Sequence, residues 1–181
     1  MNRKLLRAHV AIAYWVTPAE PVHSFLENMI VDLARRYNAP VFEPHVTIHV
    51  ASNHVEATEK ATLQAAFGCE PLDLKLLDVR HSGEFTKTLF VQVALNKELQ
   101  RLNEIIRSNA QNSFDYCLEP HLSLLYKKMP VSARRRLARS IKLPFSEMIF
   151  DSIKAVRCPL PTRNRADVEA WCIVATKSLR R

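Results

Sequence analysis

PHVTIHV at residues 44–50 and PHLSLLY at residues 120–126 repeat one pattern, proline-histidine-aliphatic-hydroxyl, in two separate parts of a 181-residue chain. Both stretches are rich in β-branched and aliphatic residues, which predicts a buried strand. Alternate side chains of a strand share a face, so the histidine and the hydroxyl residue of each stretch point the same way. Each predicted strand therefore presents one imidazole beside one hydroxyl group, with aliphatic side chains on the opposite face.

The order of predicted elements recurs around these two strands. Apolar spacing predicts strand, helix, strand, helix, strand in each half of the chain, and the two histidine strands occupy the same place in both. We therefore predict a single domain over residues 1–181, built from halves of roughly 1–82 and 83–181. The predicted strands are 7–16, 44–50, 71–80, 87–95, 120–126, 145–157 and 168–176, the helices are 20–37, 54–67, 97–111 and 131–142, and the last two strands are joined by a loop at 158–167.

Composition limits the classes of function. The formal net charge of +8 favours anionic partners such as nucleotides or RNA, although many small proteins are basic without a specific partner. Two glycines are too few for a glycine-rich phosphate loop or a dinucleotide-binding fingerprint. No apolar run is long enough to span a membrane. The cysteines form no C-x-x-C pair, so we expect free thiols and a cytoplasmic protein; they are Cys69, Cys117, Cys158 and Cys172.

The two histidine strands suggest a specific chemistry. If the halves are related by a pseudo-two-fold axis, His45 and His121 converge on one cleft together with Thr47 and Ser123. One imidazole can then remove a proton from an attacking water while the other protonates the departing oxygen, because the ordinary histidine pKa of ~6.5 suits both roles. The two hydroxyl groups can donate hydrogen bonds to phosphoryl oxygens. This arrangement requires no metal.

Metal binding is the alternative use of these histidines. In a regular strand His49 shares a face with His45, and His121 could complete the set of imidazole ligands. Such a site usually needs a further carboxylate or histidine. Glu43 and Glu119 precede the two histidines symmetrically and are the candidates for that role.

The triplets HVT at 45–47 and HLS at 121–123 resemble the paired H-x-[TS] signature of the 2H phosphoesterase superfamily. That group includes bacterial RNA 2′,5′-ligase-like (LigT-like) proteins and cyclic nucleotide phosphodiesterases. The resemblance is strongest to the plant-type cyclic phosphodiesterases and spans nearly the whole chain. It is carried further by YWVTP at 14–18, PVFEPHVTI at 40–48, SGEF at 82–85, PHLSLLY at 120–126 and EAW at 169–171.

The resemblance implies an α+β, bilobal, LigT-like fold, in which two pseudo-two-fold-related antiparallel sheet lobes carry helices outside and enclose a central cleft. It implies hydrolysis of 2′,3′-cyclic nucleotides to 2′-nucleotides, and of ADP-ribose 1″,2″-cyclic phosphate, without a cofactor. Carried over to this sequence, His45 and His121 are the acid–base pair, and Thr47 and Ser123 bind the phosphate.

The resemblance also implies that Tyr126, Trp15 and Phe85 line the nucleoside side of the cleft. For Trp15 and Phe85 the alternative is a place in the core. Tyr126 has the wrong parity to share a face with His121, so it reaches the cleft only if the strand ends or bulges after Leu124.

Two basic segments remain. The helix at 131–142 carries four arginines that form either a solvated face or a nucleic-acid contact. The loop at 162–167 carries Arg163 and Arg165, which suit a pyrophosphate or an RNA backbone if the loop borders the cleft, and otherwise lie on a flexible surface loop.

Two other functions stay open at this point. One is an RNA-end-processing 2H esterase or 2′,5′ RNA ligase-like enzyme, which a longer basic track beside the cleft would support. The other is a nucleotide-binding module that keeps the histidine pair without useful catalysis. We expect a monomer with no membrane partner.

Overall fold

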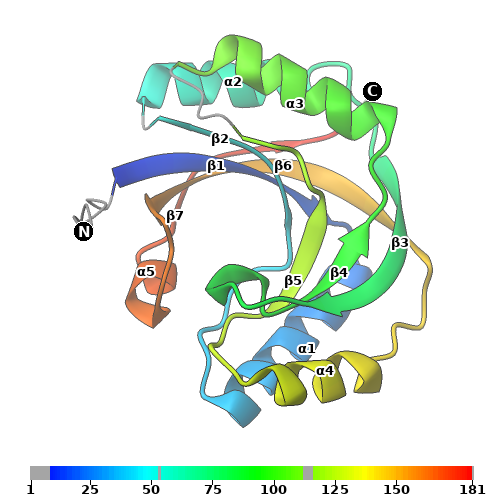
Figure 1. Ribbon diagram of the computed structural model, residues 1–181. Helices are drawn as coiled ribbons and strands as arrows, with labels where there is room; N and C mark the ends of the chain where they lie inside the picture. Colours follow the sequence, from blue (N-terminus) through cyan, green and yellow to red (C-terminus); the bar gives the residue numbers. More distant parts are fainter. Residues whose placement is uncertain (1–8, 53, 112–115, 181) are drawn as a thin grey trace.

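The computed structural model describes residues 9–52, 54–111 and 116–180 and is an α+β fold (Figure 1). Its elements are β1 (His9–Pro18), α1 (Val22–Tyr37), β2 (Val46–Ser52), α2 (Val55–Ala66), β3 (Leu72–His81), the 3-10 turn η1 (Phe85–Lys87), β4 (Leu89–Val93), α3 (Lys97–Asn109), β5 (His121–Leu125), α4 (Val131–Ser140), β6 (Glu147–Leu160), α5 (Arg165–Glu169) and β7 (Cys172–Ser178). The start of the first predicted strand, residues 7 and 8, lies outside the described residues.

The strands of the described chain form one sheet, in which all pairings are antiparallel. Their order is β1-β2-β5-β4-β3-β6-β7, and an additional pairing of β1 with β6 closes the first six strands into a ring. The predicted α+β class and the predicted recurrence are confirmed, because β1-α1-β2-α2-β3 is followed by β4-α3-β5-α4-β6. The two histidine strands, β2 and β5, are neighbours in the ring.

Both pairs of helices lie on the outside of the ring of strands, with α2 and α3 on one side of the molecule and α1 and α4 on the opposite side (Figure 1). Helix α3 shows why they dock. Its buried residues Leu99, Leu102 and Ile106 recur at helical spacing, which gives the helix one apolar face. Asn96 caps its first turn, since the Asn96 side chain accepts a hydrogen bond from the Leu99 amide at 2.9 Å.

The sequence-based prediction is wrong between residues 158 and 176. The predicted loop at 158–167 contains the end of β6 and the start of α5, and the predicted strand at 168–176 begins only at Cys172. A capping box at Asn164 explains the short helix: the Asn164 side chain accepts from the Asp167 amide at 3.1 Å, and the Asp167 carboxylate accepts from the Asn164 amide at 3.2 Å. This local hydrogen-bond pair overrides the apolar signal of the residues that follow.

Two expectations about the chain as a whole can be compared with the structure. The four cysteines are all free thiols, as the sequence predicts. Among the described residues, no helix has the length and the apolar character that a membrane crossing requires.

Candidate active site

Each histidine strand contains a bulge at the same place relative to its histidine. In β2, Thr47 lies opposite Trp15 but His49 lies opposite Tyr14, so Ile48 is an extra residue in the ladder. A bulge of this kind shifts the later residues of the strand to the other face. Residues of β2 beyond Ile48 therefore no longer follow the simple alternation set by His45.

Strand β5 repeats this irregularity. Ser123 lies opposite Phe90 and Leu125 lies opposite Leu89, so Leu124 is the extra residue. The condition for Tyr126 is met, because the bulge at Leu124 turns its side chain toward the face that carries the histidine. The duplication of the chain therefore extends to the position of the bulge.

The bulge in β2 places His49 on the opposite face from His45, whereas the regular alternation of a strand predicts that they share a face. The side chain of His49 is 1% exposed and is part of the packed face that carries Tyr14 and Ile48, not of the face that carries His45. Its Nδ1 accepts a hydrogen bond from Asn103 Nδ2 at 3.1 Å. Burial, reinforced by the charge of Arg107, lowers the His49 pKa to about 4. His49 cannot join His45 as a ligand or as a catalytic group.

The face that carries the histidines lines one cavity of about 240 Å³. Six of the seven residues singled out from the sequence lie on its wall, and Phe85 does not. The wall consists of Ala13, Trp15, His45, Thr47, Val50, Thr86, Tyr116, His121, Ser123, Tyr126, Cys158, Leu160, Pro161, Thr162 and Trp171.

Both imidazoles are held in the same way by the backbone. His45 Nδ1 lies 2.6 Å from the carbonyl oxygen of Glu43, and His121 Nδ1 lies 2.8 Å from the carbonyl oxygen of Glu119. A carbonyl oxygen only accepts, so Nδ1 carries the proton in each ring and Nε2 is the nitrogen left for chemistry. The two rings therefore present equivalent nitrogen atoms, each able to accept a proton when neutral and to donate one when charged.

The carboxylates beside the histidines are engaged elsewhere. Glu43 forms an ion pair with Lys154, and Glu119 forms one with Lys87 at 3.1 Å. Within the described ranges, no three histidine, cysteine, aspartate or glutamate side chains gather as a set of metal ligands. The alternative metal set drawn from the sequence is therefore not assembled.

The surroundings of the two imidazoles differ. His45 is 6% exposed, and its ring stacks on the Trp15 ring, with centroids 3.7 Å apart and planes inclined by 12°. Desolvation lowers the His45 pKa to about 4, against the opposing effect of the hydrogen bond to Glu43. The charge of His121, which lies on the wall of the same cavity, also lowers this pKa.

His121 is less enclosed. Its side chain is half-buried and meets the Phe90 ring edge to face, with centroids 5.5 Å apart. Burial lowers the His121 pKa from its ordinary value, and the nearby charge of Lys87 acts in the same direction. At neutral pH both imidazoles of the free protein are mainly uncharged.

The two hydroxyl residues, Thr47 and Ser123, lie on the wall of the same cavity. Ser123 is buried, and its hydroxyl group donates a hydrogen bond to the Thr86 carbonyl oxygen at 2.8 Å. Thr47 is half-buried, and its carbonyl oxygen accepts from the Tyr116 hydroxyl group at 3.1 Å. To hold a phosphate, the Ser123 hydroxyl group would exchange its bond to Thr86 for one to the ligand.

Aromatic side chains form much of the wall. Trp15 is only 4% exposed, so its ring mainly supports His45. Tyr126 stacks on Phe42, with centroids 3.8 Å apart. Trp171 was not singled out from the sequence. The centroid of its ring lies 5.2 Å from that of Trp15 and 6.0 Å from that of His45. The only sequence signal for it was its place in the EAW triplet.

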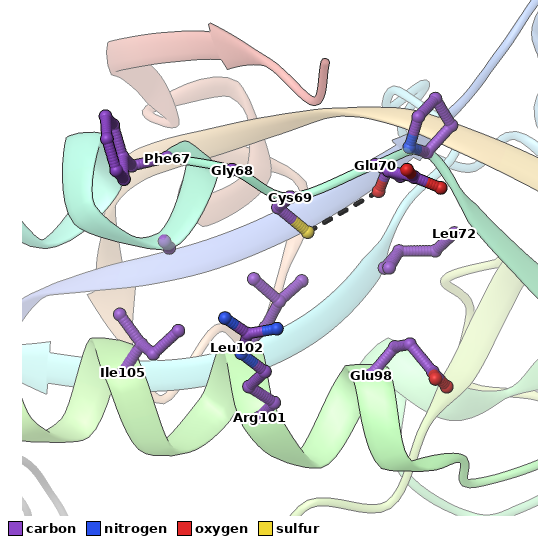
Figure 2. Close-up of a pocket in the computed structure, with 11 residues that line it drawn as sticks. Phe67, Gly68, Cys69, Glu70, Leu72, Glu98, Arg101, Leu102 and Ile105 are labelled. Atoms are coloured by element: carbon purple, nitrogen blue, oxygen red, sulfur yellow. Dashed lines mark hydrogen bonds between the residues drawn. The ribbon is translucent and has the colours of Figure 1, made fainter. Parts of the chain in front are cut away.

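A separate cavity of about 360 Å³ lies on the outer side of the protein, between the end of α2 and α3 (Figure 2). Its wall includes Phe67, Cys69, Glu98 and Arg101, and Cys69 donates a hydrogen bond from its thiol to the Glu70 carbonyl oxygen at 3.4 Å. None of the residues predicted for catalysis or substrate binding lines it. This outer cavity is therefore separate from the chemistry suggested by the sequence.

Comparison with solved structures identifies the fold. E. coli LigT complexed with 3′-AMP superposes with a TM-score of 0.60 at 13% sequence identity, covering 96% of this chain and 99% of that one. The protein TT0787 of Thermus thermophilus superposes with a TM-score of 0.56 at 18% identity, covering 94% and 98%. No curated protein sequence is similar enough to count as a match. The LigT-like fold predicted from the two histidine motifs is confirmed.

The sequence also matches a family of proteins directly. The match is to the family described as cyclic phosphodiesterase-like protein, and it runs over residues 10–177. It spans both histidine strands, both bulges and every residue of the wall of the imidazole cavity. The chain therefore belongs to the cyclic phosphodiesterase-like family of the 2H phosphoesterase superfamily.

Proposed function

We propose that this protein is a metal-independent cyclic phosphodiesterase. Its substrates would be 2′,3′-cyclic nucleotides or ADP-ribose 1″,2″-cyclic phosphate, opened to the phosphomonoester. The observation that carries the proposal is the pair of equivalent imidazoles on one cavity wall, each with Nδ1 fixed by a backbone carbonyl and Nε2 left for proton transfer. E. coli LigT, which has the same fold, has been crystallised with 3′-AMP, phosphate, ATP and NADP+.

The reaction needs one proton to leave water and one to reach the departing ribose oxygen. In the productive state one of His45 and His121 is neutral and the other is charged. The neutral ring takes a proton from water as the new P–O bond forms, and the charged ring protonates the ribose oxygen as its P–O bond breaks. The hydroxyl groups of Thr47 and Ser123 donate to the non-bridging oxygens, where negative charge develops.

The test is turnover of 2′,3′-cyclic AMP in the presence of EDTA. We expect full activity in the chelator, and a loss of about 10²–10⁴-fold in kcat for His45→Ala and for His121→Ala, the range typical of a positioned acid or base. Activity that disappears in EDTA and returns with a divalent cation would refute metal independence. A single variant that keeps full kcat would remove that histidine from the chemistry.

Tight binding of 2′-AMP by a protein that yields no product over hours would instead identify a nucleotide-binding module. The two functions differ in the same assay, because product formation by the wild-type protein separates them.

A further inference from the structure

The carbonyl oxygen that fixes the His45 ring belongs to a segment outside the sheet. Strand β2 begins at Val46, so Glu43 lies before the first residue that pairs with a neighbouring strand. The Glu43 carbonyl oxygen must nevertheless be aimed accurately, because it accepts from His45 Nδ1 at 2.6 Å and so decides how Nε2 of the same ring is presented. The position of Glu43 therefore depends on the contacts of its own side chain.

The Glu43 side chain contacts two other elements of the fold. Its carboxylate pairs with the ammonium group of Lys154 in β6, and it lies 3.3 Å from Nε2 of His23 in α1. The side chains of Lys154 and Glu43 are only 18% and 22% exposed, so water and salt screen this ion pair less than a pair on the open surface. The Glu43 carboxylate thus ties the segment before β2 to β6.

Lys154 also lies beside the second support of the His45 ring. In the sheet it stands opposite Trp15 of β1, and side chains at directly opposed positions share a face. The Trp15 ring in turn stacks on the His45 ring, with centroids 3.7 Å apart. The ion pair to Glu43 and the stacked ring therefore start from neighbouring positions in the sheet and hold the same imidazole.

The segment before the other histidine strand is held differently. The Pro120 carbonyl oxygen accepts from the Val93 amide at 3.1 Å and from the Gln92 side chain at 2.8 Å, so β4 anchors the backbone next to Glu119. In the part of the chain that the structure describes, no hydrogen bond reaches the Pro44 carbonyl oxygen. The side-chain ion pair is therefore the main fastening before β2, whereas backbone bonds already fasten the segment before β5.

We propose that Lys154 is a positioning residue, which holds the Glu43 carbonyl oxygen against His45 Nδ1 by binding the Glu43 carboxylate. Lys154 does not line the imidazole cavity, so it acts on the reaction only through Glu43 and His45. A ring that keeps its hydrogen bond presents Nε2 in one orientation, whereas a released ring spends time in orientations that cannot transfer the proton. The inference rests on the proposed cyclic phosphodiesterase function and adds a residue to its machinery.

Lys154→Met tests this role, because methionine keeps most of the length of the side chain and removes the charge. We expect kcat for 2′,3′-cyclic AMP to fall by roughly tenfold to 10²-fold, the loss that a small misplacement of a catalytic group produces. KM should change little, because the cavity wall is intact. Lys154→Arg, which restores a cation, should recover most of kcat. The control Lys177→Met removes one charge from an exposed position on the neighbouring strand β7 and should keep the wild-type kcat.

A double variant separates positioning from direct participation. Glu43→Met keeps the backbone carbonyl oxygen but removes the carboxylate that Lys154 binds, so it should also lower kcat. Lys154→Met/Glu43→Met should lose no more than Glu43→Met alone, because both substitutions break the same contact. Losses that multiply would show that Lys154 acts independently of Glu43 and would overturn the proposal. A wild-type kcat in Lys154→Met would overturn it as well.

The Nδ1 proton of His45 gives a readout that needs no turnover. Its hydrogen bond and burial should slow its exchange with water, so proton NMR should show a downfield signal that is absent from His45→Ala. We expect this signal to broaden or vanish in Lys154→Met and to persist in Lys177→Met. The corresponding signal of His121 should remain in both variants and shows that they are folded.

The NMR measurement separates the two proposals. If the His45 signal persists unchanged in Lys154→Met, the positioning role is wrong, and the proposed function stands provided that the wild-type protein hydrolyses 2′,3′-cyclic AMP. If the signal is lost in Lys154→Met but the wild-type protein forms no product, the positioning role is supported and the proposed function is wrong.

Discussion

Replacing His49 by leucine should make the protein markedly less sensitive to acid. The bulge in β2 places this imidazole in the core, with its pKa at about 4, and within the described part of the chain its Nε2 has no hydrogen-bond partner. Leucine is the residue that β5 carries at the equivalent position, Leu125. Asn103 keeps a partner in the variant, since its side chain also donates to the Ile48 carbonyl oxygen at 2.7 Å.

The magnitude follows from proton linkage. The folded state resists protonation of His49 down to about pH 4, whereas the unfolded chain takes up that proton near pH 6.5, so stability falls as the pH drops between these values. Between pH 7.5 and 4.5 this one group costs the wild-type protein about 2.5 kcal/mol of unfolding free energy. His49→Leu removes that loss.

Urea denaturation at the two pH values measures the effect, with turnover of 2′,3′-cyclic AMP as a second readout. We expect the variant to lose about 2.5 kcal/mol less stability than the wild type on acidification, and to keep its activity, because His49 faces away from the cavity. An equal loss of stability in both proteins would refute the conclusion that His49 is buried in its neutral form. A loss of activity as large as that of His45→Ala would refute the change of face at the bulge.

Three further outcomes are expected from the site. Burial lowers the pKa of both His45 and His121, so the free enzyme that carries one proton on this pair becomes scarce above neutral pH. We therefore expect kcat/KM to decline as the pH rises from 6 to 8. A flat pH profile would contradict the proposal that a charged histidine acts as the general acid. Ser123→Ala should lower kcat by about 10²-fold, because the variant loses one hydrogen-bond donor to the charge that develops on the phosphoryl oxygens. Circular dichroism serves as the control that the variant is folded. In His121→Ala, the NMR-titrated pKa of His45 should rise, because the charge of His121 lowers it in the wild type; an unaltered value would show that the rings are not close.

The parts of the fold that depend on periodic apolar spacing could be read from the sequence. The recurrence of strand and helix, the two histidine strands and the burial of their aliphatic faces all follow from local patterns. The bulges could not be read, because a two-residue period carries no sign of an extra residue at Ile48 or Leu124. That single omission put His49 on the wrong face and left the place of Tyr126 conditional.

Residues that reach the site from loops were also beyond the sequence. Trp171 follows a short helix whose capping box was taken for part of a loop, and Tyr116 arrives from the segment before β5. Phe85, which is predicted to lie beside the nucleoside, lines a separate cavity together with Asn38, Tyr126 and Arg163. All three aromatic residues lie in irregular segments, where hydrogen bonds specific to the folded chain decide the direction.

The triplet Glu-Pro-His stands at the head of both histidine strands, and its proline explains how each imidazole is held. Pro44 and Pro120 have no amide hydrogen to give to the sheet, so regular pairing begins only at Val46 in β2 and at His121 in β5. The carbonyl oxygen of the preceding glutamate is then free to accept from Nδ1 two residues later. In the metal-binding alternative drawn from the sequence, the two glutamate carboxylates were candidates for further metal ligands beside the histidines. In the folded chain it is their backbone that fixes the ring, which leaves the carboxylates for Lys154 and Lys87 and leaves both Nε2 atoms to the cavity.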